Sequence, residues 1–468
     1  MVHASPARGN SLAARDIASV LHPYTNLKKH ESAGPMMISE GRGVYVTDDA
    51  GKTYIEGMAG LWCTSLGFNE ERLVAAAVKQ MRRLPYYHAF NHKSYDVAVD
   101  LAERLIELAP VPMSKAFFAN SGSEANDTVV KFVWYYNNAL GRPKKKKIIS
   151  RIKGYHGVTV ASASLTGLPN NHRDFDLPIA NILHTSCPHY YRFGNPGESE
   201  ADFVSRCAAD LEALIQKEGA DTIAAFIAEP IMGAGGVIVP PSGYFEKIQP
   251  ILKKHDILLI ADEVICGFGR TGNMWGSETL SIKPDIMTMA KALSSAYLPI
   301  SAVLIGQRVY EALRENSDKI GVFGHGYTYT AHPVAAAVAV ETLKIYAERE
   351  IVGHVRKVGP RLQAGLRKLA DHPLVGEVRG LGLFGAIELV ADKKTKASFD
   401  PKQAVGPFMA KRCEEHGLIV RAMGGDSIAV CPPLIITEDE IDLLLQRYTK
   451  ALEDTAAHVK QQGLAKVA

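Results

Sequence analysis

Two apolar runs near the middle of the chain carry most of the information about the fold: residues 257–268 read ILLIADEVICGF, and residues 284–291 read PDIMTMAK. Short apolar runs of this kind are typical of strands that are buried on both faces of a parallel sheet. The first run leads into Asp262 and the second into Lys291, so both side chains are expected where a strand leaves the core. Open α/β sheets bind their ligands at that edge. A helix-capping aspartate and a solvated lysine are the plainer alternatives for an isolated pair.

The composition is that of a soluble globular protein. The 468 residues are 47% hydrophobic and 22% charged, and the formal net charge is +3. This charge gives no reason to expect a nucleic acid partner, and no stretch approaches the ~20 apolar residues that cross a bilayer. None of the six cysteines stands in a CxxC pair, so neither a disulfide framework nor a metal site is indicated. The N-terminus has no apolar segment of signal-peptide length, and we therefore expect a cytoplasmic protein with no metal and no membrane contact.

The middle of the chain alternates short apolar runs with longer amphipathic segments, which is the signature of a mostly parallel sheet with helices on both faces. The chain length suggests more than one domain, and we place a large α/β domain at residues 65–325. The expected strands are Lys115–Ala119, Lys147–Arg151, Thr222–Ala228, Ile257–Ala261, Ile286–Thr288 and Ile300–Ile305. The expected helices are 70–83, 97–109, 124–139, 201–218 and 244–255.

The flanking segments, 1–64 and 326–468, have a different pattern and are expected to join into a smaller α+β domain. Residues 36–57 alternate apolar and polar positions around a turn at 48–51, which predicts an antiparallel hairpin. On the C-terminal side, helices are expected at Pro333–Ala347, at 350–371 and from about residue 440, with short strands within 374–390 and 418–431.

A turn rich in hydroxyl groups and glycine follows the expected strand at 115–119. It reads NSGSEAN over residues 120–126 and opens a helix. Free backbone N–H groups at a helix N-terminus, two serine hydroxyls and a glycine that permits close approach make Ser121, Gly122 and Ser123 a candidate phosphate cup. The alternative is an ordinary capping box, because Ser-x-x-Glu is also the signature of a helix cap.

Two further strand ends carry candidate cofactor residues. The sequence Gly154-Tyr155-His156-Gly157 places an aromatic ring between glycines, where Tyr155 could stack on a planar ligand or serve as a buried core residue. Glu229 follows the strand at 222–228 and could form a hydrogen bond near a ligand ring or cap the backbone. We expect Tyr155, His156 and Glu229 beside the cofactor.

Asp262 and Lys291 together indicate which cofactor this is. A buried carboxylate keeps a pyridine nitrogen protonated, because opposite charges favour each other's ionised form in a low dielectric. A lysine amine forms an imine with an aldehyde, and the freed amine can move a proton if its pKa falls below the reference value of ~10.4. Pyridoxal phosphate offers both the nitrogen and the aldehyde and acts as an electron sink. Lys291 and Asp262 are therefore the candidate catalytic residues.

Seven motifs extend this pattern over nearly the whole chain, from about residue 20 to about residue 455. They are NSGSEAN, GYHG, AEPIMGAGGVIVPP, LLIADEVICGFGRTG, MAKALSSAYLPI, HGYTYTAHP and LIVRAMGGD, in this order. The set resembles the class III aminotransferases of the fold-type I pyridoxal-phosphate enzymes, specifically the ω-transaminase branch with amine:pyruvate and β-alanine:pyruvate activities. The resemblance implies a mostly parallel seven-stranded sheet. It also implies transfer of an amino group from a primary amine or ω-amino acid to pyruvate or another 2-oxo acid by a ping-pong mechanism.

The resemblance also implies roles for the cofactor residues. Lys291 would be the Schiff-base lysine, Asp262 the partner of the pyridine nitrogen and Val264 the residue packed under the ring. The phosphate would bind at residues 121–123, and Tyr155 would stack on the ring.

Other implied roles depend on a second subunit. Thr328 would reach the phosphate of the neighbouring subunit's cofactor, which implies a homodimer with active sites at its interface and leaves a tetramer open. By the same resemblance, an aromatic pocket for the amine would be built by Tyr24, Trp62, Tyr155 and the partner's Phe90.

Arg421 would pair with the carboxylate of the 2-oxo acid and swing aside for an uncharged amine. Ala234 stands where the ornithine and γ-aminobutyrate branches carry a glutamate, so its small size argues against those two substrates. Two glycines, Gly424 and Gly425, follow Arg421 where the family usually shows one. This departure bears on how far Arg421 can reach.

Two other reactions fit the same residues, because an aminomutase and a decarboxylase of this family share the lysine, the aspartate and the phosphate cup. Dependence on an added 2-oxo acid distinguishes the aminotransferase from both. A nucleotide-dependent dehydrogenase is disfavoured because no GxGxxG follows the first strand of a βαβ unit. The natural amine donor is left open between arylalkyl amines, diamines, polyamines and ω-amino acids.

Overall fold

The structure is a computed structural model of the chain and describes residues 9–464. Its centre is a seven-stranded sheet with the strand order β4-β10-β9-β8-β7-β5-β6. All neighbouring pairs are parallel except those of β10, which is antiparallel to β4 and β9. The strands are β4 (Lys115–Ala119), β5 (Lys147–Arg151), β6 (Ile182–Thr185), β7 (Ile223–Ala228), β8 (Leu258–Asp262), β9 (Ile286–Met289) and β10 (Ser301–Ile305). This confirms the predicted mostly parallel, seven-stranded α/β fold.

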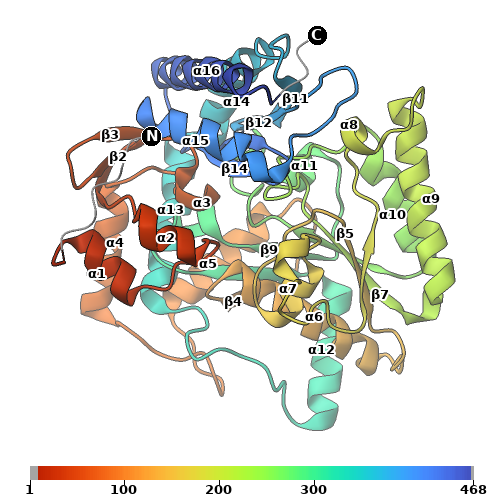
Figure 1. Cartoon of the computed structure of the whole chain (residues 1–468). Helices are drawn as coiled ribbons and strands as arrows, with labels where there is room; N and C mark the ends of the chain where they lie inside the picture. The colour runs from red at the N-terminus through yellow and green to blue at the C-terminus, as the bar shows by residue number, and fades with distance from the viewer. Residues whose placement is uncertain (1–8, 465–468) are drawn as a thin grey trace.

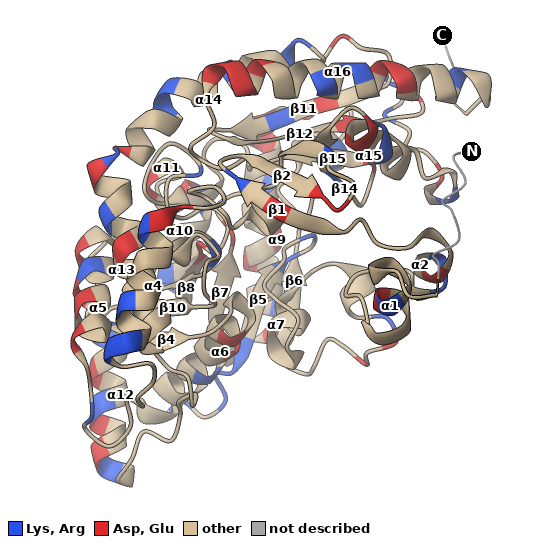
Figure 2. Cartoon of the chain, turned by 90° about the vertical axis from the view of Figure 1, so that its left-hand side faces the viewer, with Lys and Arg blue, Asp and Glu red and all other residues tan. Residues whose placement is uncertain are grey.

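Helices cover both faces of this sheet, which is why its strands are apolar along their whole length. In β7, Phe226 packs in the same cluster as residues of α9 (Glu200–Glu218) and α10 (Tyr244–Lys254). The next residue, Ile227, packs in a second cluster with α6 (Gly122–Ala139) and α12 (Gln307–Ile320) on the opposite face. Figure 2 shows that Lys, Arg, Asp and Glu residues lie mainly on the outer helices, whereas the strands of the central sheet between them have almost none.

Two smaller sheets are built from the N- and C-terminal parts of the chain. The first has the order β1-β2-β3-β13, in which C-terminal β13 pairs in parallel with N-terminal β3. The second has the order β11-β12-β15-β14, and helices α14, α15 and α16 lie against these strands (Figure 1). The bounds are β1 (Ile38–Arg42), β2 (Tyr45–Asp48), β3 (Thr53–Glu56), β11 (Val375–Leu381), β12 (Phe384–Leu389), β13 (Leu418–Ile419), β14 (Arg421–Met423), β15 (Ser427–Val430), α14 (Ile351–Arg367), α15 (Val405–Glu415) and α16 (Glu438–Gln461). The expected α+β unit therefore draws on both ends of the chain.

The other helices are α1 (Leu12–Ser19), α2 (Leu27–Ala33), α3 (Ala59–Trp62), α4 (Glu71–Arg83), α5 (Asp96–Leu108), α7 (Val160–Leu165), α8 (Tyr190–Phe193), α11 (Gly276–Thr279) and α13 (Pro333–Glu348). Among the described residues, no helix is both long enough and apolar enough to cross a membrane.

The sequence analysis missed one strand of the central sheet and simplified the flanks. Strand β6 was not expected, because only two of its four residues are buried and His184 interrupts the apolar run. The predicted hairpin at 36–57 contains three strands, β1 to β3, and the segment 418–431 contains β13, β14 and β15.

Candidate functional site

The C-terminal ends of five strands of the central sheet meet around one cavity of about 370 Å³. These strands are β4, β5, β7, β8 and β9, and the loops that follow them supply most of the lining. All the residues expected to hold the cofactor line this cavity except Thr328: Ser121, Gly122, Ser123, Tyr155, His156, Glu229, Asp262, Val264 and Lys291. The structure thus brings together residues that lie far apart in the sequence.

The N-terminus of α6 forms one wall of the cavity. The Ser121 hydroxyl caps this helix by accepting from the backbone N–H of Glu124 at 3.2 Å, so the capping role considered for this motif is present. Within residues 9–464, the backbone N–H groups of Gly122 and Ser123 have no acceptor. They lie at the positive end of an 18-residue helix, where an anion is stabilised.

Two glycines keep this wall accessible. Gly157 has a φ of +138°, and a Cβ atom there would lie 2.5 Å from the Ser123 hydroxyl oxygen. A Cβ atom on Gly122 would lie 3.1 Å from a methyl group of Val264. Any larger residue at Gly157 would therefore push against the serine that is expected to bind phosphate.

Asp262 lines the cavity at the end of β8, and its side chain is held by three hydrogen bonds. One carboxylate oxygen accepts from Nδ1 of His156 at 2.7 Å and from Nδ2 of Asn126 at 2.9 Å. The other accepts from the backbone N–H of Val264 at 3.1 Å. Because Asp262 is buried and has no arginine or lysine among these partners, it is well placed to balance a cationic ring nitrogen of a ligand.

Lys291 follows β9 at the start of a short 3₁₀ turn and has a φ of +50°, a left-handed conformation that is uncommon for lysine. Burial lowers the pKa of its ammonium group, and the nearby Asp262 carboxylate partly opposes this effect. A buried lysine with a lowered pKa has a larger fraction of free amine, which is the form that attacks an aldehyde and accepts protons.

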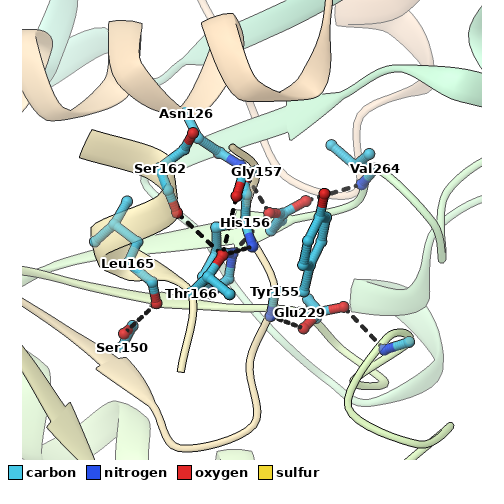
Figure 3. Close-up of polar contacts among 12 residues, drawn as sticks. Asn126, Ser150, Tyr155, His156, Gly157, Ser162, Leu165, Thr166, Glu229 and Val264 are labelled. Carbon is cyan, nitrogen blue, oxygen red and sulfur yellow. Dashed lines mark hydrogen bonds and ion pairs between the residues drawn. The ribbon is translucent and has the colours of Figure 1, made fainter. Parts of the chain in front are cut away.

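Glu229 is a fully buried carboxylate that shapes the loop bearing Tyr155. It accepts from the backbone N–H groups of Tyr155 and Gly233, each at 2.9 Å. Burial raises the pKa of Glu229. Figure 3 shows Tyr155, His156, Glu229 and Val264 around this network, with the Tyr155 ring standing beside it. The expected hydrogen-bonding role of Glu229 is therefore directed to the backbone of the two loops.

Residues expected to contact substrate lie beside the cavity. The guanidinium of Arg421 lies 4.8 Å from the centre of the Trp62 ring, in a cation–π contact. Trp62 and Ala234 belong to one hydrophobic cluster. Arg421 is partly buried, which lowers its pKa, and within residues 9–464 it has no carboxylate partner. The second glycine at 424–425 does not prevent β14 from presenting Arg421 next to Trp62.

Three other predicted residues lie outside the cavity. Tyr24 is exposed, and its hydroxyl accepts a hydrogen bond from Asn171 at 2.6 Å. Phe90 and Thr328 are also exposed and lie close to each other. Phe90 covers Gly326, and the hydroxyl of Tyr86 donates to the carbonyl of Thr328 at 2.8 Å. Neither residue lines the cavity of its own chain.

Asn126 was the main residue that the sequence analysis did not assign. Its side chain donates to Asp262 and, at 2.7 Å, to the carbonyl of His156. The signal was present, since Asn126 closes the NSGSEAN motif and lies four residues after Gly122 on one face of α6. An amide inside a helix has no distinctive spacing, however, and its partner is 136 residues away in sequence.

These features fit pyridoxal phosphate. The free N–H groups of α6 suit the phosphate, the Asp262 carboxylate suits a protonated pyridine nitrogen, and Lys291 suits the aldehyde. In the described part of the chain, the buried Nε2 of His156 has no hydrogen-bond partner, so a polar group is free in this wall. The N–H groups, the carboxylate and the amine thus match the phosphate, the ring nitrogen and the aldehyde of the cofactor.

Comparison with known proteins places the chain in a family. The family model for aminotransferase class-III matches residues 27–452. The omega transaminase from Pseudomonas jessenii in complex with PMP superposes with a TM-score of 0.95 at 57% identity, covering 96% of this chain and 99% of that one. Among curated relatives, γ-aminobutyrate transaminase 3 of Solanum lycopersicum is 53% identical, over 97% of this chain and 88% of its own length. Vanillin aminotransferase of Capsicum annuum is 51% identical, over 91% of this chain and 93% of its own length.

The name of the tomato relative does not support the expectation drawn from Ala234, which disfavoured γ-aminobutyrate as a substrate. That expectation stays a prediction about this chain. The family itself is shown by the extent of the match and by the identity to these relatives. The chain belongs to the class III aminotransferases, which are pyridoxal-phosphate-dependent enzymes of fold type I.

Proposed function

We propose that this enzyme transfers an amino group from a primary amine or ω-amino acid to pyruvate or another 2-oxo acid, in two half-reactions of a ping-pong cycle. When bound, pyridoxal phosphate supplies an electron sink and carries the amino group between the half-reactions. The residues on the cavity walls bind it, orient it and move protons.

The cofactor residues divide this work. We assign the phosphate to the N-terminus of α6, at residues 121–123, and the ring to the space between Tyr155 and Val264. Asp262 holds the ring nitrogen in its protonated form, and its own orientation is fixed by His156 and Asn126. This assignment is supported by the position of these residues around one cavity.

Lys291 is the proposed base. Its Nζ atom would take the proton from the substrate carbon that bears the amino group and would deliver it to the C4′ carbon of the bound cofactor. This role needs a neutral amine near neutral pH, and the lowered pKa of the buried lysine supports it. The closeness of Asp262 limits that lowering, because a negative charge stabilises the ammonium form.

The observation that carries the choice of acceptor is the guanidinium of Arg421, which lies against the Trp62 ring and has no carboxylate partner among the described residues. A partly buried arginine without a carboxylate partner is costly unless a ligand supplies one. A 2-oxo acid brings that carboxylate in the second half-reaction, whereas an uncharged amine leaves Arg421 on the Trp62 ring. This contact supports a 2-oxo acid as the acceptor, and the likeness to transaminases favours the aminotransferase over the aminomutase and decarboxylase alternatives.

We also propose that the active enzyme is a homodimer. Phe90 and Thr328 lie together on the surface, away from the cavity of their own chain. Exposed apolar residues surround them, which is typical of an interface. These neighbours are Tyr86, Tyr87 and Tyr329. In a dimer, Phe90 would enter the partner's substrate pocket and Thr328 would reach the partner's phosphate.

The test is a screen of amine donors with and without pyruvate, in which alanine is measured. The donors are β-alanine, γ-aminobutyrate, putrescine, a polyamine and 1-phenylethylamine. The proposal expects alanine from at least one donor and no sustained turnover without a 2-oxo acid. Continued conversion of an amine in the absence of any 2-oxo acid would instead support the aminomutase or the decarboxylase.

A further inference from the structure

Two histidines and an aspartate meet in the N-terminal segment, and none of them lines the cofactor cavity. Asp16 belongs to α1, His30 to α2 and His22 to the connection between these helices, which lie side by side (Figure 1, Figure 2). One carboxylate oxygen of Asp16, Oδ1, lies 2.8 Å from Nε2 of His22 and 3.3 Å from Nε2 of His30. We call these three residues the N-terminal triad.

The geometry of the N-terminal triad is close to that of ligands around a cation. The centres of the two imidazole rings are 4.1 Å apart, and both rings turn Nε2 toward the same oxygen. In a tetrahedral zinc site, nitrogen and oxygen ligands lie about 2.0–2.2 Å from the ion and therefore about 3.3–3.6 Å from one another. The separation of Asp16 from His30 already has this value, and that from His22 would widen by about 0.5 Å.

The charges around the N-terminal triad also favour a cation. Within residues 9–464, no lysine or arginine pairs with Asp16, and its carboxylate is bonded only to the two histidines. A second cluster of this kind, formed by His189, Glu377 and Glu388, shows the contrast. There Arg379 is bonded to both carboxylates at 2.6 Å, so a guanidinium already supplies the positive charge.

The segment that carries the N-terminal triad has little apolar packing of its own. Helix α1 has eight residues and α2 has seven, and neither contains a buried residue. Helices of this length are marginal in water, and small units with little core often depend on a bound metal. The three triad side chains are nevertheless largely covered, with exposed fractions of 16% for Asp16, 27% for His22 and 11% for His30. An ion held by them would join α1, α2 and their connection.

We propose that Asp16, His22 and His30 bind a divalent transition-metal ion, best matched by Zn²⁺, which joins α1 to α2. Two imidazoles and one carboxylate suit Zn²⁺ and its neighbours in the first transition series, whereas Mg²⁺ and Ca²⁺ prefer oxygen ligands. Each imidazole binds through Nε2 and carries its proton on Nδ1, and water takes the fourth position. The lack of cysteine pairs, from which no metal was expected, has no bearing on a site built by histidines.

The test is the binding of Zn²⁺ to the tag-free, full-length holoenzyme after treatment with a chelator, measured by equilibrium dialysis and metal analysis. We expect one Zn²⁺ per chain. His22→Gln and His30→Gln should each weaken binding at least about tenfold, since even the loss of a residue that only orients a metal ligand costs about 10- to 100-fold. His416→Gln is the matched control and should bind as the wild type. His416 also pairs with a carboxylate, that of Asp454 at 2.6 Å, but Arg412 shares that carboxylate and no second histidine is bonded to it.

Hydrogen exchange measured by mass spectrometry gives a second readout. At a saturating concentration, Zn²⁺ should slow the exchange of peptides that cover residues 12–33 at least about fivefold in the wild type and in the His416 control, because the ion binds only the joined helices. The two triad variants should show no such slowing. Mg²⁺ and Ca²⁺ at the same concentration should have no effect on any of the proteins.

The proposal is overturned if the wild type binds no Zn²⁺, if both triad variants bind it as tightly as the wild type, or if the His416 control loses binding to the same degree. Equal slowing of exchange by Ca²⁺ would also overturn it, because an ion that prefers oxygen ligands has no need of two histidines. Cofactor absorbance and melting temperature show whether the variants are folded. Should His30→Gln fail to fold, His22→Gln decides, since its side chain is the most exposed of the three.

Discussion

Replacing Arg421 by alanine tests how the enzyme accepts both an amine and a 2-oxo acid. A charge-assisted hydrogen bond from a guanidinium to a carboxylate contributes about 1.5–3 kcal/mol, which corresponds to roughly 10- to 150-fold in binding. If the guanidinium must leave the Trp62 ring, 4.8 Å away, to reach the substrate, about 0.5–1 kcal/mol of cation–π energy is lost in exchange. The net contribution is about 0.5–2.5 kcal/mol, and we therefore expect Arg421→Ala to raise the KM for pyruvate by about 2- to 70-fold.

The first half-reaction should be nearly unaffected by this change. Transfer from 1-phenylethylamine, which has no carboxylate, can be followed as the change in cofactor absorbance in a single turnover, and its rate should stay within about threefold of the wild type. Arg361→Ala, which removes an exposed arginine paired with Asp442, is the matched control and should alter neither half-reaction. Equal loss in both half-reactions would refute the reasoning, because it would show that Arg421 supports the structure of the pocket instead of binding the acceptor.

Three further outcomes follow from the buried groups. Lys291→Ala should lose turnover by several orders of magnitude, and borohydride treatment of the wild type should label Lys291; labelling of another lysine would end the assignment. Asp262→Asn should reduce turnover by about 100-fold or more while the melting temperature changes little, since an amide cannot balance a protonated ring nitrogen; turnover within about threefold of the wild type would contradict that role. Burial raises the pKa of Glu56 from 4.5 to about 7, so its contribution to stability is present at low pH and is lost as pH rises between these values. Glu56→Gln should remove this pH dependence of the free energy of unfolding, which is worth at most about 3 kcal/mol and is measured by denaturant unfolding at pH 5 and pH 8. If the difference in unfolding free energy between the two pH values is the same in the variant, Glu56 does not cause it.

The central sheet was predictable because its strands are buried on both faces. An apolar run such as 257–261 has few alternatives, and Asp262 at its end then marks the ligand edge of the sheet. β6 was not predictable in this way, because two of its four residues are only partly buried and resemble loop residues.

The residues that line the cofactor cavity were predictable from the order of the motifs. The hydrogen bonds that orient their side chains were not. The hydrogen bond from Asn126 to Asp262 joins α6 to β8, and nothing in the local sequence of either element specifies the other.

The pairing of β3 with β13 explains how the two ends of the chain build the acceptor site. Ile419 lies opposite Glu56, so Arg421 and the turn that bears Trp62 both follow directly from paired strands. That turn is strained, because Ala59, Gly60 and Trp62 all have positive φ, and such residues cost about 1–3 kcal/mol each when they are not glycine. The buried Glu56 carboxylate accepts from the backbone N–H groups at 58 and 60 and so holds the turn in place. The fold therefore holds Trp62 in place, and Arg421 packs against its ring in the absence of an acceptor.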